Sequence, residues 1–113
     1  MAKRTVALLM VVLALLTLTG CGKPKGMSDA NYEACKQIVA VYDAYLDFKL
    51  GNKEAGAKVA AISSGMAPDN SVQGTYYAQF GATEGSFLEF SDDPSRVLED
   101  RNDLAEAIGM AKR

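Results

Sequence analysis

Apolar residues recur at helical spacing between positions 30 and 50, and this pattern constrains the fold more than any other feature of the chain. Residues three or four positions apart share one side of an α-helix, and a stripe of this kind contains Cys35, Ile38, Val39, Tyr42, Tyr45 and Leu46. Val41 and Phe48 widen the stripe to about half of the helix circumference, which is more than one neighbouring element can cover. The segment 30–50 is therefore predicted to be the central helix of a small domain.

Capping residues and chain breakers mark the other elements. Ser28 or Asp29 is expected to cap the central helix, and Gly51 to end it as a left-handed residue. Asn52 is expected to cap a second helix over 53–64, which a loop over 65–71 follows. Asp93 and Pro94 begin a last helix, which ends with the basic pair Lys112 and Arg113 and has an apolar face made of Val97, Leu98, Leu104, Ala105 and Ile108.

The segment 72–90 admits two interpretations. As a helix it aligns Val72, Tyr76, Phe80 and Phe87, at the cost of three internal glycines. As a hairpin it has strands at 75–80 and 86–90 around a turn at 81–85. We favour the helix, because an isolated hairpin needs further strands and none is evident elsewhere. The predicted fold is all-α, a bundle of about four helices over 28–113, and the alternative is an α+β fold with a hairpin at 75–90.

Residues 1–20 have the composition of an export signal. Lys3 and Arg4 provide a basic start, and the following segment 6–16 contains no polar residue. The apolar stretch is shorter than the roughly 20 residues that a membrane-spanning helix requires. We expect this segment to be removed during export.

The signal ends in the order Leu18, Thr19, Gly20, Cys21, which resembles the lipobox of bacterial lipoproteins. The resemblance covers residues 1–21 alone. It implies cleavage before Cys21, a diacylglyceryl group on the Cys21 thiol, and a third acyl chain such as palmitate on the new amino group where the host adds one. Because each buried methylene contributes ~0.8 kcal/mol, two chains anchor a protein far more durably than one. The implied location is the non-cytoplasmic face of the cell membrane or outer membrane.

Charge separates the anchor from the domain. A lipidated cysteine and short linker over 21–27 include Lys23 and Lys25, each of which contributes ~1 kcal/mol of attraction to an anionic membrane. The segment 28–113 contains 14 acidic and eight basic residues, a net charge of −6. Nucleic acid is therefore not an expected partner of the domain.

The residue types present argue against an enzyme. The chain has no histidine, which removes the commonest general base and a common metal ligand. The acidic residues are expected to cap helices or to lie on solvated helix faces: Asp43, Asp47, Asp92, Asp93, Glu99, Asp100 and Asp103. Cys35 is expected in the core, and the alternative is a homodimer through a Cys35 disulfide. No cofactor other than the lipid on Cys21 is expected.

Five of the nine aromatic residues lie between positions 76 and 90. Core packing is their simplest role, but adjacent Tyr76 and Tyr77 cannot both face inward, so we single out Tyr76, Tyr77 and Phe80 as candidate interaction residues. The expected function is a non-enzymatic interaction module that binds another envelope protein. One alternative is a phage- or prophage-encoded lipoprotein for superinfection exclusion. Another is a lipoprotein that binds a small apolar or cationic ligand between helices, through Tyr42, Tyr45 and Tyr76.

Overall fold

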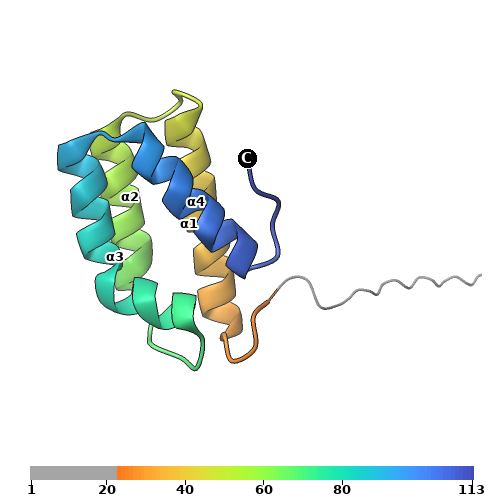
Figure 1. The fold of residues 1–113 in the computed structure, drawn as a ribbon. Helices are drawn as coiled ribbons and strands as arrows, with labels where there is room; N and C mark the ends of the chain where they lie inside the picture. The colour runs from red at the N-terminus through yellow and green to blue at the C-terminus, as the bar shows by residue number, and fades with distance from the viewer. Residues whose placement is uncertain (1–22) are drawn as a thin grey trace, which may run out of the picture.

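The computed structural model describes residues 23–113, and within this part of the chain it contains helices and no strands (Figure 1). The helices are α1 (Asp29–Leu46), α2 (Asn52–Ser64), α3 (Val72–Ser91) and α4 (Pro94–Ala107). The all-α bundle is confirmed, and α3 occupies the segment for which a hairpin was the alternative. The predicted export signal and the lipobox, Leu18 to Cys21, lie outside the described residues. None of the described helices is both long and apolar enough to cross a membrane.

Helix α1 is the centre of the bundle, as its wide apolar stripe predicts. It packs against all three other helices, and its buried side chains include Cys35, Ile38, Val39, Tyr42 and Tyr45. Leu88 of α3, Val59 of α2 and Leu104 of α4 complete the core from the other sides. The Ser28 side chain accepts a hydrogen bond from the Asn31 backbone N–H at 3.1 Å, which confirms the predicted N-cap.

The end of α1 differs from the prediction. The helix stops at Leu46, and the backbone N–H groups of Lys49 and Leu50 turn back to the Ala44 carbonyl oxygen, at 2.7 and 3.2 Å. This turn places Phe48 in the left-handed region with φ 61° and leaves its side chain 94% exposed. Phe48 is therefore not part of the buried stripe, because the helix that would have turned it inward has already ended.

The start of α2 also differs. Gly51 has an extended backbone and is the N-cap of α2, so it is not the left-handed end of α1. Asn52 is the first residue of α2 and does not cap it. Its side-chain amide instead donates a hydrogen bond to the Glu89 carbonyl oxygen of α3 at 2.8 Å. Asn52 thus joins two helices that lie side by side (Figure 1).

Helices α2 and α3 approach each other through glycines. A Cβ atom built at Gly85 would lie 2.5 Å from the carbonyl oxygen of Gly56 and 3.1 Å from the Cβ of Ala60. Near the other end of the contact, the Ser63 hydroxyl donates to the Tyr77 carbonyl oxygen at 2.5 Å, and a Cβ at Gly81 would collide with this serine. Gly81 and Gly85 therefore form the face of α3 that packs against α2.

This packing turns the apolar stripe of α3 outward. The buried residues of α3 are Gly74, Tyr77, Gly81, Glu84, Gly85 and Leu88. The aligned residues Val72 and Phe80 are 78% and 50% exposed, because backbone contact with α2 requires the glycine face to point inward. Core packing of the aromatic cluster, the simplest role, is thus wrong for most of its members.

For the last helix, the predicted start is confirmed and the predicted end is wrong. The Asp93 side chain accepts a hydrogen bond from the Arg96 backbone N–H at 3.2 Å, with Pro94 in the first turn. Leu98 is 37% exposed and so does not belong to the buried face. Because α4 stops at Ala107, the two basic residues predicted to end it, Lys112 and Arg113, lie beyond it in the C-terminal segment.

The C-terminal segment returns to α1 (Figure 1). Arg113 forms ion pairs with Asp43 at 2.9 Å and with Asp47 at 2.6 Å. Asp43 also accepts a hydrogen bond from the buried side chain of Arg101 at 2.8 Å. The side of α1 that was predicted to be solvated is therefore partly covered by basic side chains.

The loop between α2 and α3 is organised by Asp69. Its Oδ2 atom accepts hydrogen bonds from the Ser28 backbone N–H at 2.9 Å and from the Asn31 side chain at 2.8 Å. Its Oδ1 atom accepts from the backbone N–H and the hydroxyl of Ser71, at 2.8 and 2.6 Å. One carboxylate therefore joins the beginnings of α1 and α3.

Candidate functional site

A cavity of about 270 Å³ lies between α3 and α4, two helices that contact each other sparsely. Its apolar walls come from Val72 and Leu104, and its aromatic wall comes from Tyr76 and Tyr77. Three carboxylates, those of Glu84, Asp100 and Asp103, also line it. The cavity combines a hydrophobic surface with an excess of acidic groups, and sequence analysis did not predict this arrangement.

Glu84 is the most buried of these acids, with 8% of its surface exposed. It lies on the glycine face of α3, which directs it toward the interior instead of toward water. Its Oε2 atom accepts a hydrogen bond from the Tyr76 hydroxyl at 2.6 Å and one from the Arg96 guanidinium at 3.3 Å. A buried charge persists only when it is paired in this way.

Asp100 lies beside Glu84, contrary to the prediction that it would belong to a solvated face. Burial and the neighbouring Glu84 carboxylate raise the pKa of Asp100 to about 7, and Arg96, whose Nε atom is 3.3 Å from Asp100, opposes the shift. Two carboxylates thus share a single guanidinium, and Asp100 is the one whose pKa is raised toward neutral pH. The sequence signal was present as Arg96 and Asp100 one helical turn apart, but local spacing does not reveal Glu84 opposite them.

The tyrosines around this pair are neutral. Burial raises the pKa of Tyr76 to about 12, and its hydrogen bond to Glu84 acts in the same direction. Burial raises the pKa of Tyr77 and of Tyr42 still further, and their hydroxyl oxygens are 3.4 Å apart. The rings of Tyr76 and Tyr77 meet edge to face with centroids 5.1 Å apart. The site therefore has an aromatic wall that carries no charge of its own.

The three candidate interaction residues occupy different environments. Tyr76 and Phe80 are 39% and 50% exposed, and their ring centroids are 5.5 Å apart. Tyr77 is buried, so the two adjacent tyrosines differ in exposure although their rings are in contact. We define the outer face of α3 as the side that bears Val72, Tyr76, Phe80, Phe87 and Phe90. Within it Phe90 is 77% exposed, whereas Phe87 is covered by the Arg96 guanidinium, 4.1 Å from its ring centroid.

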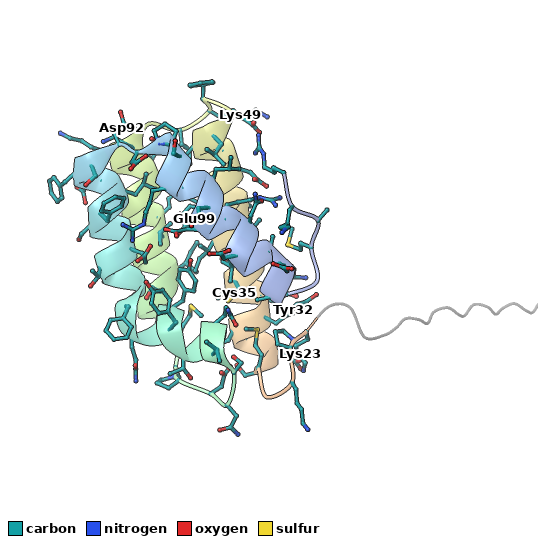
Figure 2. The ribbon with its side chains drawn as sticks, viewed as in Figure 1. Lys23, Tyr32, Cys35, Lys49, Asp92 and Glu99 are labelled. Atoms are coloured by element: carbon teal, nitrogen blue, oxygen red, sulfur yellow. The ribbon has the colours of Figure 1, made fainter. Side chains whose placement is uncertain are left out.

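The tyrosines suggested for ligand binding do not converge. Tyr76 alone among them lines the cavity, while Tyr42 lies behind Tyr77 in the core. The Tyr45 hydroxyl donates to Asp92, which lies at the α3–α4 junction together with Lys49 at the same end of the bundle (Figure 2). Tyr45 therefore belongs to a different part of the fold.

Cys35 lies inside the bundle (Figure 2) and is fully buried. Burial raises the pKa of its thiol to about 11, so the thiolate is scarce at neutral pH. A disulfide between two copies would require the core to open first.

Within the part of the chain that the structure describes, no three acidic or cysteine side chains are grouped in a way that could hold a metal ion. Comparison with protein-family models, with curated proteins and with solved structures finds no match to this chain.

Proposed function

We propose that this chain is a lipoprotein of the bacterial envelope, anchored through Cys21, whose helical domain is a non-enzymatic module that binds another envelope protein. The outer face of α3 is the proposed contact surface. The observation that supports it is the exposure of Val72, Tyr76, Phe80 and Phe90 on one side of a single helix. Scattered exposed apolar residues are ordinary, whereas several of them on one side of a single helix are typical of a binding surface.

The dimensions of this face suit a protein partner. Eighteen residue steps separate Val72 from Phe90, which corresponds to about 27 Å along a helix. An aromatic side chain buries roughly 150–250 Å² in all, and those of Tyr76, Phe80 and Phe90 are 39%, 50% and 77% exposed, so this face supplies part of the roughly 800 Å² that one partner buries in a standard interface. The net charge of −6 on the domain favours a partner with basic groups around an apolar centre.

The anchor is tested by the intact mass of the protein extracted in detergent from its native membrane. We expect a chain that begins at Cys21 and carries two or three acyl chains. Cys21→Ser removes the thiol that accepts the diacylglyceryl group, so its signal should remain uncleaved by the lipoprotein-specific route. An unmodified wild-type chain, or one cleaved elsewhere, would refute the anchor.

The contact surface is tested by photocrosslinking in intact cells. A photoreactive phenylalanine analogue at position 80 should crosslink to one envelope protein, and the same analogue at exposed Ala57 on α2 should not. Adding Tyr76→Ala and Val72→Ala should reduce the position-80 crosslink at least about fivefold, since hot-spot residues carry most of an interface's energy. Equal products from positions 80 and 57, or crosslinks to lipid alone, would contradict the proposal.

A further inference from the structure

The carboxylates of the cavity are incompletely neutralised. Arg96 supplies one contact of 3.3 Å to Glu84 and one of 3.3 Å to Asp100. The Tyr76 hydroxyl and the Arg96 guanidinium both donate to Oε2 of Glu84, and the remaining hydrogen-bond partner of Glu84 is the Asp100 carboxyl, which has a proton to donate only when it is protonated. Because the Glu84 side chain is only 9% exposed, water compensates little of this charge. One negative charge of the pair is left for a proton or for another cation.

We propose that the cavity between α3 and α4 binds a small organic cation, an ammonium group on a short alkyl chain, with Glu84 and Asp100 as its counter-charges. This site shares Val72 and Tyr76 with the outer face of α3, but it requires neither the anchor nor the protein partner. Its volume of about 270 Å³ corresponds to about nine water molecules, enough for a small alkylammonium ion.

The walls favour an organic cation over a hydrated metal ion. Val72 is 78% exposed and offers apolar surface to an alkyl chain, which a shell of metal-bound water would not use, while Leu104 lies buried behind it. The rings of Tyr76 and Tyr77 line the same space, and aromatic faces attract ammonium groups. Both tyrosines are neutral, so their rings attract the ammonium group without changing the net charge of the site.

Binding should compete with a proton. The ionisable groups around Asp100 come from three helices: Glu84, Tyr76 and Tyr77 of α3, Arg96 and Asp103 of α4, and Tyr42 of α1. The tyrosines stay neutral and Arg96 stays charged between about pH 5 and pH 8, whereas the pKa of Asp100 is raised to about 7. A cation displaces the proton shared by the carboxylates, so its affinity should decrease as the pH falls below about 7.

The test is a calorimetric titration of the full-length chain in detergent with n-butylammonium chloride, with n-butanol as the neutral comparison. We expect one saturable site for n-butylammonium at about pH 8, at least roughly tenfold weaker at about pH 5.5, and no comparable binding of n-butanol. Glu84→Gln keeps the shape of the side chain and removes its charge, so it should weaken binding at least about tenfold.

Glu99→Gln is the matched control, because Glu99 is exposed on α4 beside Asp100 and does not line the cavity (Figure 2). It makes the same change in net charge and should alter affinity less than about twofold. Circular dichroism checks the fold, and Asp100→Asn replaces Glu84→Gln if the latter does not fold. Equal losses in the cavity variant and in Glu99→Gln, comparable binding of n-butanol, or no saturation at about 50 mM n-butylammonium would overturn the proposal.

Discussion

Gly85→Ala is expected to destabilise the domain by about 3 kcal/mol, although alanine is the better helix former by about 1 kcal/mol. The new methyl group would lie 2.5 Å from the Gly56 carbonyl oxygen and 3.0 Å from the Ala60 backbone nitrogen. Backbone atoms cannot rotate away as a side chain can, so α2 and α3 must separate along their length. For a domain of this size the loss corresponds to a fall in Tm of roughly 10–25 °C.

Thermal unfolding followed by circular dichroism measures this effect. Gly65→Ala is the control, because a Cβ at Gly65 meets only the Ile62 carbonyl oxygen at an ordinary 3.7 Å and the backbone there has a negative φ. That variant should change Tm by no more than a few degrees. If Gly85→Ala is as stable as Gly65→Ala, the close approach of α2 and α3 is wrong.

Asp69→Asn is expected to lower the free energy of unfolding by about 3 kcal/mol, because it removes the carboxylate that joins the beginnings of α1 and α3. Four donor contacts reach the two oxygens of Asp69, whereas asparagine offers one oxygen and turns an NH₂ group toward the remaining donors. The contacts cross from the α2–α3 loop to Ser28 and Asn31, so their loss should loosen the start of α1 as well as the loop. Urea denaturation should show the change as a lower midpoint.

The destabilisation caused by Asp69→Asn should depend on pH in a definite direction. Burial alone would raise the pKa of Asp69, but the hydrogen bonds from Ser71, Ser28 and Asn31 outweigh it and hold the pKa well below its usual range. A depressed folded-state pKa gives stability that is present above the unfolded value of about 3.9 and is lost as the pH falls below it. The difference between wild type and Asp69→Asn should therefore be constant near neutral pH and shrink below about pH 4.

Asp47→Asn provides the matched control for Asp69→Asn. It removes a carboxylate whose ion pair with Arg113 is solvent-exposed, with side chains 44% and 34% exposed. Such pairs contribute up to about 1 kcal/mol, so the control should be clearly more stable than Asp69→Asn. Equal stability of the two variants would show that Asp69 does not organise the loop.

Local patterns predicted the helices well because helix formation depends on neighbours in sequence. The caps Ser28 and Asp93 and the stripe around Tyr42 all follow from spacing alone. The orientation of α3 does not, since Gly81 and Gly85 have meaning only once α2 lies against them. Hydropathy favoured the aromatic side of α3 for the core, whereas backbone contact selected the glycine side.

The cavity was missed for a related reason. Sequence reasoning places acidic residues in water unless a partner is identified, and the partners of Glu84 are Tyr76 and Arg96, eight and twelve positions away. Asp69 was likewise recognised as a loop residue, but its bond to Ser28 spans 41 positions. Contacts of this range depend on how helices pack, which no local pattern contains.

The burial of Cys35 gives the bundle a kinetic reporter of its own opening. With Cys21 lipidated or replaced by serine, Cys35 is the chain's single free thiol, and no part of it is exposed in the folded state. A thiol reagent then modifies only molecules whose core has opened, and each tenfold slowing relative to a free thiol corresponds to about 1.4 kcal/mol of protection. Modification rates measured in crude extracts would therefore rank Gly85→Ala and Asp69→Asn without purification.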